Sequence, residues 1–194
     1  FRGGGRDGDV VHRGLAYMIV NFAIWLQNTA LFSYIRYAAY GYLSLLTAHV
    51  ILITLFGAMV AATNLRLLGI GFRKHSISDL VDQLRVPKRI GLVLVVTCGV
   101  LLYGSKAEEY YYNPFFRVKL TLLALIAIHA LAFRKSVYAN AAGLDRAAAI
   151  PGRAKLAAGL SLFLWLSVLC AGRAIGYISP ADSPHHYAFL ASPL

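Results

Sequence analysis

The feature that most restricts the fold is the length of the apolar runs in this sequence. Residues 37–65 contain no Asp, Glu, Lys or Arg, and further apolar runs follow at about 88–105, 115–133 and 155–178. A bilayer core about 30 Å thick is crossed by roughly 20 apolar residues of helix. Each run is therefore long enough, or nearly so, to span a membrane. The first span is expected over about 38–62. The sequence predicts an all-α integral membrane protein in which residues 38–178 form a four-helix up-down bundle.

The overall composition agrees with a protein surrounded by lipid. Apolar residues make up 59% of the chain and charged residues 14%, whereas a soluble domain carries about 25% charged residues. The formal net charge is +11, but the basic residues cluster between the apolar runs, and no nucleic-acid recognition motif accompanies them. We therefore expect the lipid bilayer as a partner and no nucleic acid.

The residues before the first run give a mixed signal. Residues 14–35 are largely apolar but include Asn21, Gln27 and Asn28. A narrow polar side at helical spacing is typical of a helix that lies in the membrane interface, and we favour this over a fifth span. The N-terminal segment, residues 1–37, is thus expected to carry an interfacial amphipathic helix. The proline-containing tail, residues 179–194, is expected to be irregular.

Lys and Arg are concentrated in two of the connections between the runs. The segments 63–89 and 134–155 are strongly basic, whereas "SKAEEYYYNP" at 105–114 carries one lysine beside Glu108 and Glu109. By the positive-inside rule, the two basic connections lie in the cytoplasm. Both chain ends and the 105–114 turn then face the outer side of the membrane.

Local signals predict where the helices begin. Residues 76–87, "SISDLVDQLRVP", predict a short amphipathic helix in the first basic connection, with Ser78 as its N-cap. Pro87, Pro114 and Pro151 each precede or open one of the later spans, where a missing N–H is tolerated. The first connection is therefore expected to hold a helix of its own, separate from the second span.

Several short motifs carry a family resemblance. They comprise Trp25, Leu26, Thr29, Ile35, Arg36, His49, "NLRLLG" at 64–69, "NPFFRVKLTLLAL" and "SLFLWLSVLCAGRAIGY". In these the chain resembles, over about 25–178, the DUF6644 family of uncharacterised bacterial four-helix integral membrane proteins. It departs from the family pattern at Leu46, commonly Glu, at Asn64, usually Asp, and at His129, usually Asn. The resemblance implies a four-helix fold in a bacterial inner (cytoplasmic) membrane and implies no activity. In such a membrane, the positive-inside rule puts both termini on the periplasmic side.

Two histidines, His49 and His129, fall inside the predicted spans. An imidazole in a bilayer core is costly unless it is paired, hydrogen-bonded or bound to a metal. The first and third spans run parallel at diagonal corners, so the two rings could ligate one haem b from opposite faces. Other candidate haem contacts are Gly57, Gly91 and Gly99, which leave room for a macrocycle, and Arg66, Lys119 and Arg173, which could pair with propionates. Alternatively, each histidine donates to a backbone carbonyl or hydroxyl of a neighbouring helix.

The sequence leaves two hypotheses of function. The first is a small subunit that anchors or stabilises a larger membrane assembly, with other membrane or periplasmic subunits as partners. The second is a b-type electron-transfer subunit with His49 and His129 as axial ligands of haem iron. A non-catalytic or electron-transfer subunit is expected in preference to a stand-alone enzyme, because the sequence shows no Gly-rich phosphate loop and no Ser/His/Asp order. The predicted spans contain no Asp or Glu, which argues against proton or cation transport. No catalytic residue is assigned.

Overall fold

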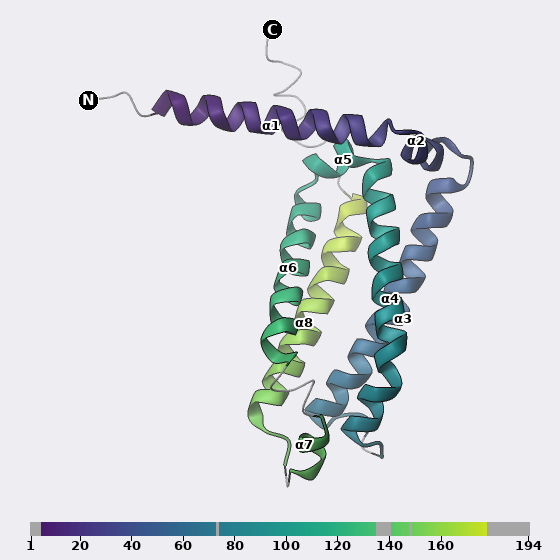
Figure 1. The fold of residues 1–194 in the computed structure, drawn as a ribbon, viewed down its shortest axis with the longest axis vertical. Helices are drawn as coiled ribbons and strands as arrows, with labels where there is room; N and C mark the ends of the chain where they lie inside the picture. Colours follow the sequence, from purple (N-terminus) through teal and green to yellow (C-terminus); the bar gives the residue numbers. More distant parts are fainter. Residues whose placement is uncertain (1–4, 73, 135–140, 148, 178–194) are drawn as a thin grey trace.

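The computed structural model describes residues 5–72, 74–134, 141–147 and 149–177, and these are helical apart from the connections (Figure 1). The helices, in chain order, are α1 (Gly5–Gln27), α2 (Ala30–Tyr37), α3 (Gly41–Leu68), α4 (Ile77–Ser105), α5 (Ala107–Tyr112), α6 (Pro114–Arg134), α7 (Ala141–Arg146), α8 (Gly152–Ala174) and the 3-10 turn η2 (Ile175–Tyr177). No strand occurs among the described residues. The predicted irregular tail, residues 179–194, lies outside them.

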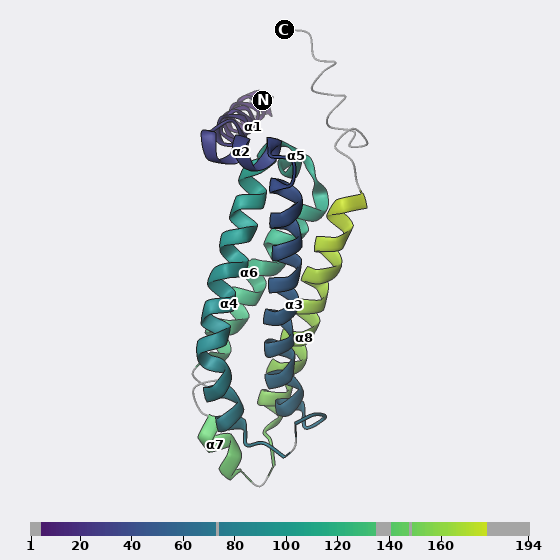
Figure 2. The same cartoon turned by 90° about the vertical axis from the view of Figure 1, so that its right-hand side faces the viewer.

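Four helices are long and apolar enough to cross a membrane: α3, α4, α6 and α8 with η2. They run side by side in alternating directions, and the closest pairs are α3 with α4, α6 with α8 and α3 with α8. Figure 2 shows α3 and α6 at diagonal corners. The predicted all-α, four-helix up-down membrane bundle is therefore confirmed. We call its two ends the α1 end, where α3 begins, and the α7 end, where α3 finishes.

Two spans are longer than predicted at the α7 end. Helix α3 continues past residue 62 to Leu68 and ends at Gly69, whose φ of 77° is a left-handed cap suited to glycine. The extension carries Thr63 and Asn64, which are buried because Lys88 donates to the Thr63 hydroxyl and Asn64 Nδ2 donates to Ser161 Oγ at 2.9 Å. Polar residues that find partners on other helices need not end a span.

The prediction of a separate helix over 76–87 is wrong. These residues form the first turns of α4, which continues through Pro87. The N-cap is Ser76, whose Oγ accepts the Asp79 N–H at 3.0 Å, and not Ser78. Ser78 instead donates its hydroxyl to Asp145 on α7. The predictions for the other two prolines hold, since Pro114 opens α6 and Pro151 is the N-cap of α8.

The densest packing lies at the α7 end, where α7 docks against the start of α4. The buried residues there are Leu67, Ile77, Ala141, Leu144, Ala154, Ala157 and Ala158. The Asp145 carboxylate accepts from Ile77 N at 2.7 Å, Ser78 N at 2.9 Å and Ser78 Oγ at 2.7 Å. The carboxylate thereby satisfies amides at the N-terminus of α4 that have no partner within the helix.

Helix α1 lies across the opposite end of the bundle and projects beyond it (Figure 1). Ala23 and Gln27 are buried against the bundle, and Gln27 Nε2 donates to Glu108 Oε2 at 3.1 Å. Phe22 and Trp25 are exposed. The segments Tyr17–Gln27 and Ala30–Tyr37 are bent by 69° and together are apolar enough for a broken span. Helix α1 runs across the ends of the spans, and the interfacial helix within residues 14–35 stays a prediction.

Candidate functional site

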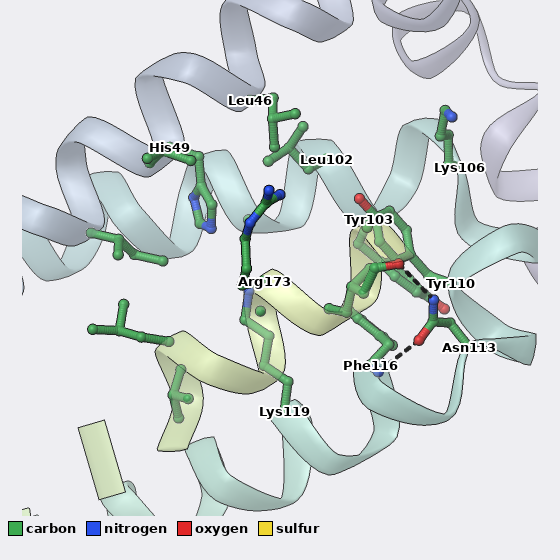
Figure 3. A pocket seen from close by; sticks show the side chains of 18 of the residues that line it. Leu46, His49, Leu102, Tyr103, Lys106, Tyr110, Asn113, Phe116, Lys119 and Arg173 are labelled. Carbon is green, nitrogen blue, oxygen red and sulfur yellow. Dashed lines mark hydrogen bonds between the residues drawn. The ribbon is translucent and has the colours of Figure 1, made fainter. Parts of the chain in front are cut away.

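A pocket of about 530 Å³ lies between the four spans in the half of the bundle nearer the α1 end (Figure 3). Every span contributes to its lining: His49 from α3, Gly99 from α4, Lys119 from α6, and Gly172 with Arg173 from α8. Side chains of α5 and the adjoining turns close it toward the α1 end. Polar groups that the sequence distributes over four separate spans are thus brought to one cavity.

The pocket exists because α3 and α8 diverge. Near the α7 end they are joined by the Asn64–Ser161 hydrogen bond, and midway the Phe56 and Trp165 rings meet at 5.2 Å between centroids. Figure 2 shows the two helices separating from there toward the α1 end. Leu46, Val50 and Leu169, which line the pocket, are exposed at its edges. The pocket is therefore a wedge that opens sideways, toward the lipid-facing surface.

His49 is the most buried polar side chain of the pocket lining at the level of the spans, with 8% of its surface exposed. Its ring lies against α4, where a Cβ at Gly99 would come within 3.2 Å of Cε1, so glycine makes room for the imidazole. The ring also interacts with the backbone carbonyl of Val95 on α4. Nδ1 is buried and has no hydrogen-bond partner in the described part of the chain. His49 therefore retains an unused nitrogen, which is uncommon for a buried polar group.

Two cations, Lys119 and Arg173, also reach this pocket (Figure 3). Lys119 Nζ lies close to α8, 3.5 Å from the position of a Cβ on Gly172. The Arg173 guanidinium lies 4.8 Å from the ring centroid of Tyr177. Within the described ranges, neither side chain forms an ion pair, since the salt bridges there join Arg85 to Asp82 and Lys106 to Glu109. The pocket thus has an excess of positive charge.

Aromatic and amide side chains close the pocket toward the α1 end. The hydroxyls of Tyr42 and Tyr110 are hydrogen-bonded at 2.9 Å, and Phe116 stacks on Tyr103 at 5.3 Å. Asn113 Oδ1 accepts from Phe115 N and Phe116 N, while its Nδ2 donates to Ile175 O at 3.2 Å. Burial, followed by the hydrogen bond with Tyr42, raises the pKa of Tyr110 well above its ordinary value. Tyr110 therefore remains a neutral donor or acceptor.

His129 lies away from this pocket. Its Nε2 is hydrogen-bonded to the Ala157 carbonyl of α8 at 3.0 Å, and its ring packs on Phe133 at 4.9 Å. His129 follows Pro114 by fifteen residues, whereas His49 follows Gly41 by eight. At 1.5 Å per residue, these depths are about 22 Å and about 12 Å from the helix starts. The structure does not bring the two imidazoles to one cavity.

The chain matches a known protein-family model. The model of a family of unknown function, DUF6644, matches residues 22–178, which include all four spans and every residue of the pocket lining. The chain belongs to the DUF6644 family. Comparisons with curated proteins and with solved structures gave no significant match. The predicted family resemblance is confirmed, and membership assigns no activity to this DUF6644 protein.

The remaining candidate residues of this DUF6644 chain divide between the pocket and other places. Gly99 lies in the pocket, but Gly91 faces Phe56 and Met59, and Gly57 has open space beside it. Arg66 is at the α7 end, where its Nε donates to His75 O at 2.7 Å.

Sequence reasoning missed the Tyr42–Tyr110 pair and the capping role of Asn113. Neither tyrosine is among the candidate site residues predicted from the sequence. Asn directly before Pro114, however, is a helix-start signal. That signal could have identified Asn113 as the residue that begins α6. Nothing in the sequence indicated that Tyr42 and Tyr110 meet.

Proposed function

We propose that this chain is a small integral membrane subunit that anchors or stabilises a larger, redox-linked membrane assembly. The observation that supports this best is helix α1, which projects beyond the four spans and exposes aromatic side chains, Phe22 and Trp25 among them. Exposed aromatic residues at a membrane surface suit contact with lipid head groups and with other subunits. The described pocket offers groups that bind ligands and no paired carboxylates or activated nucleophile.

The same proposal includes an orientation in the bacterial inner membrane. Lys74, Arg89, Arg153 and Lys155 belong to the α7 end, where the connections are basic. By the positive-inside rule this end faces the cytoplasm, and the α1 end with both termini faces the periplasm. The projecting helix would then meet membrane or periplasmic partners on the outer side.

Co-purification tests the subunit role. The full chain, tagged and extracted in a mild detergent, is expected to emerge with other membrane proteins, and the Phe22→Ser/Trp25→Ser variant is expected to recover less of them. Leu160→Ser, which changes an exposed apolar residue on α8, serves as the matched control and should leave recovery unchanged. A chain that emerges alone under every mild condition, and whose deletion leaves all membrane complexes intact, contradicts the proposal.

The second candidate is a b-type haem electron-transfer subunit, favoured by His49 lying in a pocket with Lys119 and Arg173. His49 could hold haem iron through a ring nitrogen, and the two cations could pair with propionates. A bis-His site does not fit the arrangement described, because His129 would have to leave Ala157 and reach a cavity that it does not line. A bound haem would supply one-electron transfer, and these residues would position it.

Visible spectra test the haem candidate. Protein purified from cells supplied with ample haem is expected to show a reduced-minus-oxidised b-type α-band that His49→Ala abolishes. His129→Ala is the comparison: it should leave the band in place if His49 alone ligates the iron, and abolish it if both histidines do. A flat spectrum of the haem-supplied protein excludes this candidate.

A further inference from the structure

We propose that the pocket binds the phosphate head group of an anionic phospholipid, with Lys119 and Arg173 as its counter-charges and the lipid tails leaving between α3 and α8. This ligand would occupy the pocket described above. The proposal rests on the proposed function in one respect, which is that the α1 end lies near the periplasmic head groups.

The first observation is the excess positive charge. Lys119 is half-buried five residues after the start of α6, and its ammonium group lies beside Gly172 instead of extending outward to water (Figure 3). In the described residues the one acidic side chain of the pocket, Glu109, is already paired with Lys106 at 3.1 Å. A charged group inside a membrane protein normally has a partner. A ligand with a negative charge would supply the missing one.

The second observation is the direction in which the pocket opens. Its sides at the mouth are Leu46 and Val50 on α3 and Leu169 on α8, with 36%, 54% and 43% of their surfaces exposed. These apolar side chains face the lipid-facing surface of the bundle. A soluble anion would have to pass them without gaining contacts, whereas acyl chains remain in the bilayer and pack against them. The opening therefore favours an amphiphile over a free anion.

The third observation is the depth of the cations. Lys119 is about 8 Å along α6 from Pro114 at 1.5 Å per residue, and Arg173 lies in the last turn of α8. This is the level where the head groups of one leaflet meet the hydrocarbon core. A phospholipid of that leaflet can reach the pocket by a shift of about one helical turn. Arg173 offers paired N–H donors that match phosphate oxygens, and Lys119 offers a point charge.

Polar groups around the cations complete a site for the head group. His49 lines the pocket, and the Tyr42–Tyr110 hydroxyl pair lies on the side toward the α1 end. A phosphate has several acceptor oxygens and can take hydrogen bonds from more than one of these groups. The combination of cations, donors and an apolar exit is what a phospholipid head and its tails require.

Lipid binding to the full chain, purified in detergent and stripped of lipid, tests the proposal. Phosphatidylglycerol is expected to bind and to raise Tm, while phosphatidylcholine, a fatty acid and inorganic phosphate are expected to raise it much less. Native mass spectrometry should count about one retained phosphatidylglycerol. Lys119→Gln and Arg173→Gln are each expected to weaken binding by roughly tenfold or more, as for loss of one charge-assisted hydrogen bond. Lys155→Gln, an exposed lysine at the α7 end, is the control and should bind normally.

A second readout separates a ligand-binding lysine from a structural one. If the partner of Lys119 is a bound lipid phosphate, Lys119 has no partner in lipid-free detergent. The Lys119→Gln variant should then have the same Tm as the parent chain or a higher one. A lower Tm of this lipid-free variant would mean that Lys119 supports the fold itself and would overturn the proposal. Three further outcomes would also overturn the proposal. They are equal binding of anionic and zwitterionic lipids, a full rise in Tm with inorganic phosphate alone, and a haem spectrum with no retained lipid. Only the last of these outcomes bears on the haem candidate, and none decides the subunit role.

Discussion

Replacing Gly104 by alanine is expected to push α2 away from α4 and to lower the Tm of the protein in detergent. Gly104 is buried, and a Cβ there would lie 2.5 Å from Cζ and 2.7 Å from Cδ1 of Phe32, and closer still to Cε1. The ring must therefore move off the α4 backbone. Overpacking of this kind costs about 2 kcal/mol, which lowers Tm by roughly 4–8 °C for a chain of this size.

A matched control and a second genetic background test this prediction specifically. Gly57→Ala also adds a methyl group within a span, but nothing lies within 4 Å of its position. It should be neutral or should stabilise by up to about 1 kcal/mol, since alanine is the better helix former. In a Phe32→Ala background, Gly104→Ala should lower Tm much less than it does in the parent chain, because the ring that clashes is absent. Equal Tm values for the two glycine variants would show that Phe32 does not pack on Gly104.

Replacing Asp145 by alanine is expected to release α7 from the start of α4. The carboxylate accepts hydrogen bonds from the Ile77 and Ser78 amides and from the Ser78 hydroxyl. Loss of such a cap costs about 2 kcal/mol, so amide exchange of Ile77 and Ser78 should become about thirtyfold faster. Asp145→Asn keeps an acceptor oxygen and should show a smaller increase. Unchanged exchange in Asp145→Ala would mean that α7 is held by its apolar contacts alone.

The same interaction predicts a pH dependence. Desolvation alone would raise the pKa of Asp145, but hydrogen bonds from Ser78 and Ile77 and the charge of Arg66 lower it below the ordinary value of 3.8. The carboxylate therefore contributes fully above the unfolded-state pKa and loses its contribution as the pH falls through the lower folded-state pKa. Protection of the Ile77 and Ser78 amides, corrected for intrinsic rates, should decline over that acidic range in the parent chain. The decline should be absent in Asp145→Asn, and a parent profile that also stays flat would contradict the assignment.

The spans could be predicted from the sequence because each is a run of apolar residues long enough to cross a bilayer. The residues at which the spans end near α7 could not be predicted. Two consecutive polar residues such as Thr63 and Asn64 are typical of the end of a span. They lie within α3, where Lys88 donates to the Thr63 hydroxyl and Asn64 Nδ2 donates to Ser161 Oγ. The start of α4 was not predicted correctly for a related reason. Ser78 donates its hydroxyl to Asp145, which is distant in the sequence, and Ser76 accepts the Asp79 N–H as the N-cap.

The pocket was predictable only in its separate parts. His49, Lys119 and Arg173 stand out because each is a polar residue in an apolar run. Their meeting depends on the rotation of each helix about its axis, which the sequence does not determine. The same rotation turns His129 toward Ala157 on α8 and away from His49.

The Asn64–Ser161 hydrogen bond has a mechanical consequence for the space beside His49. It joins α3 and α8 fifteen residues from His49, which is about 22 Å of helix. With the two helices pinned there, a change of about 3° in the angle between them moves the walls beside His49 about 1 Å apart, given that helix length. Helices adjust their tilt to the thickness of the surrounding bilayer. A change in membrane thickness is therefore expected to change the width of the gap between α3 and α8.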